Sequence, residues 1–162
     1  MKKKKLLIIT IGILLLLFGI WNILWTMHYN QYKSYREKTQ KNIIGGQVFY
    51  TITKDDYYFS VNMPSYLRFN GNLAASKNTE DLKDGISMIV WLKLFSEDKY
   101  GVILNDENGY MYQIYMDEKG KPIYKENESI SYINETNALI DSNRDLIDEV
   151  YEKWNEVFGI RH

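Results

Sequence analysis

The sequence predicts an α+β domain joined to one N-terminal transmembrane helix, and three patterns support this prediction. Leu6 to Met27 contains no charged residue. From Gln47 to Tyr132, short β-branched and aromatic runs alternate with turn residues, which is typical of an antiparallel meander of about six or seven strands. From Glu135 to Phe158, apolar residues recur every three or four positions, as on an amphipathic helix. We expect a basic tail over residues 1–5, an anchor over 6–27, a stalk over 28–46 and one folded domain over 47–162.

The apolar segment Leu6–Met27 is long enough to cross a bilayer once. At ~1.5 Å per helical residue it spans roughly 33 Å, close to the ~30 Å of a hydrocarbon core. The preceding lysine run also fits a secretory signal, but no small-residue cleavage pattern follows it. Trp21 and Trp25 share a helix face at the end of the segment, where amphipathic aromatic residues prefer the headgroup layer. We therefore expect an uncleaved anchor in the lipid bilayer.

The basic residues near the anchor predict its orientation. Lys2, Lys3, Lys4 and Lys5 are contiguous and adjoin the apolar segment. Basic residues on the other side start farther out and are diluted by an acidic one; they are Lys33, Arg36, Lys38 and Lys41, with Glu37 among them. Because cytoplasmic flanks carry the excess of lysine and arginine, we expect a single-pass protein of the cell membrane, with its N-terminus inside and its domain outside.

The net charge of the chain after the anchor indicates which classes of partner it can bind. All 21 acidic residues follow the anchor, so the part after it is mildly acidic. Nucleic-acid binding needs a concentrated basic stripe that displaces the counterions around phosphates. We therefore expect no nucleic-acid partner.

Residues 28–46 are predicted to form a short polar stalk. Glu37 and Lys41 lie at i,i+4, which supports a continuing helix, and Gly45 and Gly46 end it. We expect a solvated connector between the membrane and the domain.

Seven segments are predicted as strands: Gln47–Thr53, Tyr57–Met63, Tyr66–Phe69 with Asn72–Ser76, Ile86–Phe95, Tyr100–Leu104, Tyr110–Met116 and Lys121–Tyr124. The step Asn70-Gly71 is expected to supply the positive φ of a tight hairpin. Ile86–Phe95 is apolar on both faces, which predicts a central strand covered on both sides. One cover is the single C-terminal helix, which Asn134 is suited to cap and Gly159 is suited to end; Asn143 interrupts its apolar stripe and needs a partner or a place at the edge.

The residues that catalysis usually requires are scarce. The chain has no cysteine, which excludes disulfides, thiolate metal sites and cysteine nucleophiles, and its only histidines are His28 and His162. The acidic pairs fall in predicted turns: Asp55-Asp56, Asp106-Glu107 and Asp117-Glu118. We expect a protein that is not an enzyme and that holds neither a cofactor nor a metal.

Aromatic residues are the main candidates for partner binding. The chain has 14 Tyr, and six of them lie on predicted hairpins, where alternate side chains face opposite sides: Tyr57, Tyr58, Tyr100, Tyr110, Tyr112 and Tyr115. All of these except Tyr100 are candidates for partner binding. Exposed tyrosine suits a recognition surface, although cross-strand packing within the sheet is the more common role. A second candidate is the acidic helix face with Asp148 and Glu152, which suits a basic partner or simply keeps the helix soluble.

This layout of a lysine tail, an uncleaved span, a polar stalk and a small acidic cysteine-free domain resembles membrane-anchored superinfection-exclusion proteins encoded by prophages of lactic acid bacteria. The resemblance covers the arrangement of the whole chain and no diagnostic motif. It implies a non-enzymatic protein at the outer membrane face that blocks DNA entry of related phages through a phage or host envelope protein, with adsorption intact. The alternative from the residues is an envelope binding module for a peptide, a wall polymer or a small solute, such as a bacteriocin immunity protein. The oligomeric state stays open.

Overall fold

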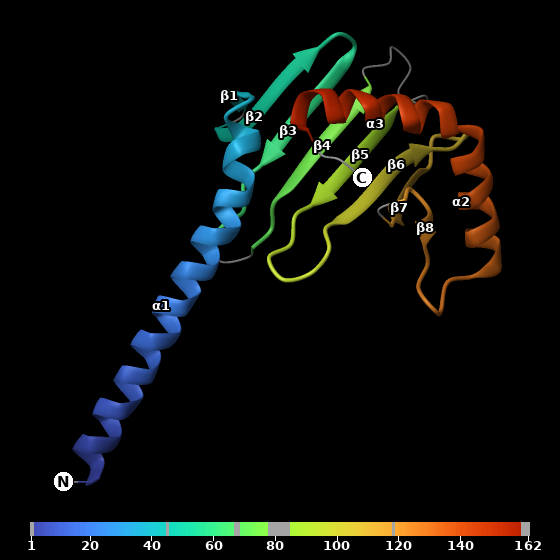
Figure 1. Cartoon of the computed structure of the whole chain (residues 1–162). Coiled ribbons are helices and arrows are strands. Elements are labelled where there is room, and N and C mark those ends of the chain that lie inside the picture. The colour runs from blue at the N-terminus through green and yellow to red at the C-terminus, as the bar shows by residue number, and fades with distance from the viewer. Residues whose placement is uncertain (1, 45, 67–68, 78–84, 118, 160–162) are drawn as a thin grey trace.

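The computed structural model of the chain describes residues 2–44, 46–66, 69–77, 85–117 and 119–159. Within these residues the protein is an α+β structure with a long apolar N-terminal helix, an antiparallel sheet of eight strands and two C-terminal helices, which confirms the predicted fold class (Figure 1). In chain order the elements are α1 (Lys2–Arg36), β1 (Gln40–Ile44), β2 (Gln47–Lys54), β3 (Tyr57–Asn62), β4 (Asn72–Lys77), β5 (Ile86–Trp91), β6 (Lys99–Asn105), β7 (Met111–Met116), β8 (Pro122–Ile123), α2 (Ile130–Ser142) and α3 (Arg144–Phe158).

The sheet is a simple meander in which each strand pairs with the next one along the chain, from β1 to β8. Every pairing is antiparallel, as the alternation of strands and turns predicts. Tyr66 and Phe69 lie outside strands, while residues 67–68 fall outside the described part of the chain, so the predicted strand there begins only at Asn72. The extra strand is β1, which the sequence had placed in the stalk.

The core lies between one face of the sheet and α3. Alternate residues of the strands, such as Phe59, Leu73 and Val102, are fully buried on this face. Helix α3 crosses the strands and buries one apolar stripe against them, namely Ile147, Val150, Trp154 and Phe158 (Figure 1). The burial of apolar area on a single side of the sheet is what holds this two-layer structure together.

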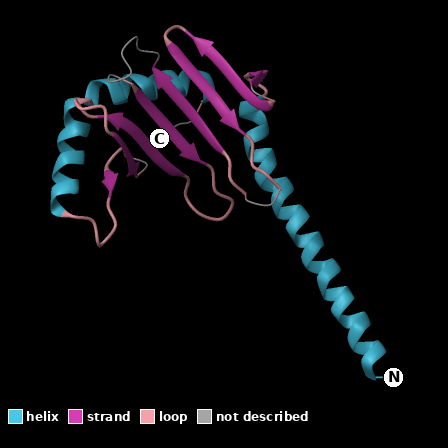
Figure 2. Cartoon of the chain, turned by 180° about the vertical axis from the view of Figure 1, so that it is seen from behind, coloured by secondary structure: helices cyan, strands magenta, loops and turns pink. Residues whose placement is uncertain are grey.

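The opposite face of the sheet is not covered by a described helix, as the view from behind shows (Figure 2). The expectation that Ile86–Phe95 is covered on both sides is therefore wrong. Met88 and Val90 face the core, whereas Ile89 and Trp91 lie half-buried on the uncovered face. The strand ends at Trp91, and Phe95 stands in the following loop with 78% of its surface exposed.

The predicted C-terminal helix is two helices that meet at Asn143. The side-chain amide of Asn143 donates to the carbonyl oxygen of Leu139 at 2.8 Å, and its backbone N–H donates to the same oxygen at 3.2 Å, so one residue closes the end of α2. Ser129, not Asn134, caps the start of α2, and its hydroxyl accepts from the Tyr132 amide at 3.2 Å. Gly159 ends α3 in the left-handed conformation, as predicted.

The stalk predicted over residues 28–46 is not a solvated connector. Helix α1 continues to Arg36, Tyr32 in its last turns is fully buried, and residues 40–44 pair with β2. The segment looks polar in sequence, but His28, Tyr32 and Tyr35 lie about four residues apart and share one helix face, which packs on the sheet domain.

Candidate interaction surfaces

The first surface is the helix–sheet junction, which we define as Trp21, Asn22, Trp25, His28 and Tyr32 of α1 with Tyr66 and Phe69 of the β3–β4 loop. The Trp21 and Phe69 rings meet edge to face with centroids 4.8 Å apart, and Trp25 meets Tyr66 at 5.2 Å. The Tyr66 hydroxyl donates to the side-chain oxygen of Asn22 at 3.0 Å. The predicted interface residues Trp21 and Trp25 therefore bind the domain as well as marking the end of the apolar segment.

Tyr32 extends the junction into the core. Its hydroxyl oxygen accepts from the buried Leu92 amide at 3.1 Å, and burial raises the pKa of this hydroxyl well above its ordinary value. Gly71 leaves room for the ring, because a Cβ there would lie 2.7 Å from Cζ of Tyr32. The positive φ expected at Asn70-Gly71 falls instead on Phe69, at 47°. Gly71 is thus required by the close approach of α1 and not by a turn.

The second surface is the open face, the side of the sheet away from α3. From β3 to β7, Lys99 is its only charged residue among the described strand positions. Polar, aliphatic and aromatic residues make up the remainder: Tyr58, Ser60, Asn62, Asn72, Ala74, Ser76, Ser87, Ile89, Trp91, Gly101, Ile103, Asn105, Met111, Gln113 and Tyr115. A face this poor in charge differs from an ordinary solvated surface and resembles the centre of a protein interface.

Trp91 and Tyr115 form the aromatic centre of the open face. Their ring centroids lie 5.7 Å apart, and Tyr115 is 43% exposed. Gly101 pairs with Tyr115 on one side and with Ile89 on the other, and a Cβ there would lie 3.0 Å from the Trp91 ring. The missing side chain allows the indole to lie flat against the sheet.

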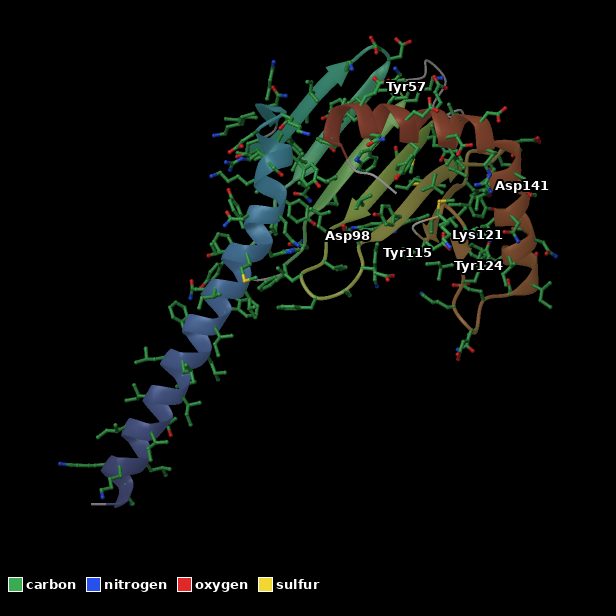
Figure 3. All side chains as sticks on the ribbon, in the orientation of Figure 1. Tyr57, Asp98, Tyr115, Lys121, Tyr124 and Asp141 are labelled. Atoms are coloured by element: carbon green, nitrogen blue, oxygen red, sulfur yellow. The ribbon has the colours of Figure 1, made fainter. Side chains whose placement is uncertain are left out.

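The predicted tyrosines do not gather on one surface. Tyr58 and Tyr115 lie on the open face, while Tyr110 stands 69% exposed in the β6–β7 turn. Tyr57 is buried under α3, and Tyr112 packs in the core against Tyr132, with centroids 6.2 Å apart. Figure 3 shows Tyr57 and Tyr115 at well-separated places on the sheet. Tyr57 and Tyr112 are therefore packing residues, which leaves Tyr58, Tyr110 and Tyr115 available to a partner.

The acidic face of α3 is partly used within the domain. Glu149 pairs with Lys77 at 2.8 Å, and Glu156 pairs with Lys54 at 3.2 Å and Lys153 at 3.1 Å. The Lys77 ammonium, assisted by the Tyr57 hydroxyl, lowers the pKa of Glu149, and the two lysines lower that of Glu156. Asp148 and Glu152 are exposed and form no ion pair within the described part of the chain, so they stay available.

The carboxylates of the predicted turns have structural roles in the backbone. One oxygen of Asp106 accepts from the amides of Asn108 and Tyr110, and one oxygen of Asp117 accepts from those of Lys119 and Lys121. Glu118 and His162 lie outside the described residues. No group of three or more metal-binding side chains occurs among the residues described.

A groove of about 830 Å³ opens beside β6 and the β7–β8 turn. Its lining mixes both charge signs with apolar surface and includes Asp98, Lys99, Tyr100, Met116, Asp117 and Lys119. Figure 3 labels Asp98, one of these lining residues. The groove is wide and holds one aromatic residue, so it suits a polar peptide or polymer better than an apolar small molecule.

Sequence reasoning missed His28 and Tyr32, the two buried residues of the junction. The available signal was the spacing of three between Tyr29, Tyr32 and Tyr35, which brings these rings close to one face of a helix. The fold and surfaces together define a small α+β domain fixed on a helix that is long and apolar enough to cross a membrane. The chain matches no family model, no curated protein and no solved structure.

Proposed function

We propose that the chain is a non-enzymatic interaction protein of the cell membrane, retained by α1, with its lysine end inside and its α+β domain outside. The observation that carries this proposal is the open face, which is uncovered and nearly free of charge. An exposed surface of this kind is typical of interaction sites, and exposed aromatic residues are frequent at recognition sites. More specifically, we propose that the domain excludes superinfecting phages by blocking DNA injection at the membrane.

The continuity of α1 supports retention of the anchor. Trp21 and Trp25 contact Phe69 and Tyr66, so cleavage after Trp25 would remove packed aromatic residues from the folded domain. N-terminal sequencing of the mature protein should find α1 intact, and a mature N-terminus beyond residue 25 would contradict the anchor. Protease added to intact cells should digest the domain, whereas complete protection would reverse the orientation.

The exclusion proposal is tested in a phage-sensitive Gram-positive host. Cells that express the chain should adsorb phage normally and yet admit little phage DNA. Unchanged infection across a panel of phages would reject exclusion.

The open face is tested by a matched pair of variants in the same host. Replacing Tyr58 and Tyr115 together by alanine should abolish protection, because both side chains stand exposed on this face. Tyr110→Ala is the control, since Tyr110 is more exposed than either but lies in a turn. If both variant proteins are present in the membrane at equal amounts and protect the cells equally well, the open face does not take part in exclusion.

The groove beside β6 supports the alternative, an envelope binding module or bacteriocin immunity protein that recognises a peptide, a wall polymer or a small solute. In that case expression would raise resistance to a bacteriocin and leave phage infection unchanged. Lys99→Glu with Lys119→Glu should then abolish resistance, because both lysines line the groove. The flat aromatic open face favours the first proposal over this one.

A further inference from the structure

We propose that the folded domain itself touches the bilayer, with Tyr66, Phe69 and Phe95 seated in the lipid headgroup layer beside α1. These residues belong to the β3–β4 and β5–β6 loops, and together we call them the aromatic edge. The partner is a lipid surface. The proposal concerns the domain and not the anchor, and it is independent of phage exclusion.

The junction sets the depth of the aromatic edge. A hydrocarbon core of ~30 Å takes about 20 helical residues, so a span that starts at Leu6 ends near Trp25. A tilted helix needs more residues and moves this boundary farther toward His28. Phe69 and Tyr66 contact α1 at Trp21 and Asn22, about one turn before Trp25. These loop residues therefore reach the level at which the apolar segment leaves the lipid.

Both polar atoms of the Asn22 side chain have hydrogen-bond partners, as a polar side chain this close to the hydrocarbon core requires. Its amide nitrogen donates to the Phe18 carbonyl oxygen at 2.6 Å, and its side-chain oxygen accepts from the Tyr66 hydroxyl at 3.0 Å. An unpaired amide close to hydrocarbon would be costly, because lipid offers no hydrogen-bonding partner. The domain thus supplies the hydrogen bond that water would supply farther out.

Phe95 lies at the same end of the sheet. Strands β3 and β5 both run antiparallel to β4, so the loops that follow them leave the sheet at the same end, at the height of the middle of α1 in Figure 1. The side-chain amide of Gln31 donates to the Lys93 carbonyl oxygen at 3.1 Å, which ties the second loop to α1. Phe95 follows two residues later with 78% of its surface exposed. Tyrosine and tryptophan prefer the headgroup level, and an exposed phenylalanine beside them buries its ring at the boundary between headgroups and acyl chains.

The junction also prevents the domain from turning away from the membrane. His28 and Tyr32 are buried, and they bind the backbones of the two loop regions at Phe69 and Leu92. A domain that is fixed to α1 in this way keeps its aromatic edge at one height. The loops can leave the headgroup layer only if these buried contacts break.

The absence of cysteine allows a direct test with the full chain. Phe95→Cys, labelled with an environment-sensitive fluorophore, is placed in vesicles of phosphatidylcholine and phosphatidylglycerol that contain lipids spin-labelled near the headgroup. Tyr110→Cys is the control, because Tyr110 is 69% exposed and lies in the β6–β7 turn at the opposite end of β6. We expect blue-shifted emission and several-fold stronger quenching at position 95. Equally weak quenching at both positions would overturn the proposal.

A second measurement leaves Phe95 in place. Two further variants, Ser96→Cys and Asn108→Cys, each carry a nitroxide label at a residue that is exposed in the native chain. The collision rate of each label with a water-soluble nickel chelate is measured in the same vesicles. The label at 96 should be several-fold less accessible than the label at 108. Equal accessibility would contradict contact with lipid, and unchanged circular dichroism of the variants shows that they fold.

Discussion

Nε2 of His28 lies 3.1 Å from the carbonyl oxygen of Phe69, so a side chain of α1 contacts the backbone of a loop that follows 41 residues later. Nδ1 of the same ring lies 2.9 Å from the side-chain oxygen of Gln31, whose amide donates to Lys93. Phe69 has a φ of 47°, a conformation that costs a non-glycine residue of the order of 1–3 kcal/mol and needs neighbours to hold it. One buried histidine therefore helps to hold two loops in place against α1.

His28→Ala should weaken the domain by about 1–3 kcal/mol, because the part-buried oxygen that accepts the ring N–H, on Phe69 or on Gln31, loses its donor and the buried ring leaves a cavity. The free energy of unfolding of the full chain in detergent, from urea titration of tryptophan fluorescence, measures this loss. Met27→Ala is the control, since Met27 is the adjacent residue and is 50% exposed. An equal effect of the two variants would show that His28 does not hold the loops.

Tyr32→Phe removes one oxygen and keeps the buried ring. The Leu92 amide then has no acceptor in the core, and we expect a loss of about 1–3 kcal/mol in the same urea titration. Tyr110→Phe removes the same atom from an exposed turn residue and should change stability by less than about 0.5 kcal/mol. A loss of that small size for Tyr32→Phe would mean that another group satisfies the Leu92 amide.

Gly71→Ala should destabilise the domain through α1, although Gly71 lies in a loop. The new Cβ would lie 2.7 Å from the Tyr32 ring and 3.0 Å from the Asn62 carbonyl oxygen, and such overpacking costs about 1–3 kcal/mol. In a Tyr32→Leu background the nearest clash is gone, so Gly71→Ala should cost less there. Strict additivity of the two changes would place the strain elsewhere.

The meander was predictable because its determinants are local, namely alternating apolar residues and short turns. Strand β1 was not, since Gln40, Lys41 and Asn42 have a polar sequence, and their extended form depends on pairing with β2. The single break at Asn143 likewise depends on a side chain that binds the preceding turn. The local sequence pattern thus predicted the architecture, whereas strand β1 and the break between the two C-terminal helices depend on strand pairing and on a side-chain cap.

The candidate surfaces were less predictable than the fold. Tyr57 and Tyr58 are adjacent and must face opposite sides, but only the placement of α3 decides which of them is buried. The junction depends on contacts across 41 and 60 residues, from His28 to Phe69 and from Leu92 to Tyr32. No periodicity within one segment contains that information.

Glu149 makes part of the stability of the domain dependent on pH. The Lys77 ammonium, 2.8 Å from its carboxylate, lowers the pKa of Glu149 below the ordinary value of 4.5. A carboxyl with a lowered pKa in the folded state stabilises that state above pH 4.5, and this contribution is lost as the pH falls through the folded-state pKa.

Glu149→Gln should therefore unfold at lower urea than the native chain at pH 7, and the gap between their midpoints should close as the pH falls below about 4.5. Because both partners are partly exposed, salt should reduce the gap as well. Glu152→Gln provides the control, since Glu152 is exposed on the same helix without an ion pair among the described residues. A gap for Glu149→Gln that stays constant from pH 7 to pH 3 would show that the carboxylate charge contributes nothing to the packing of α3 on β4.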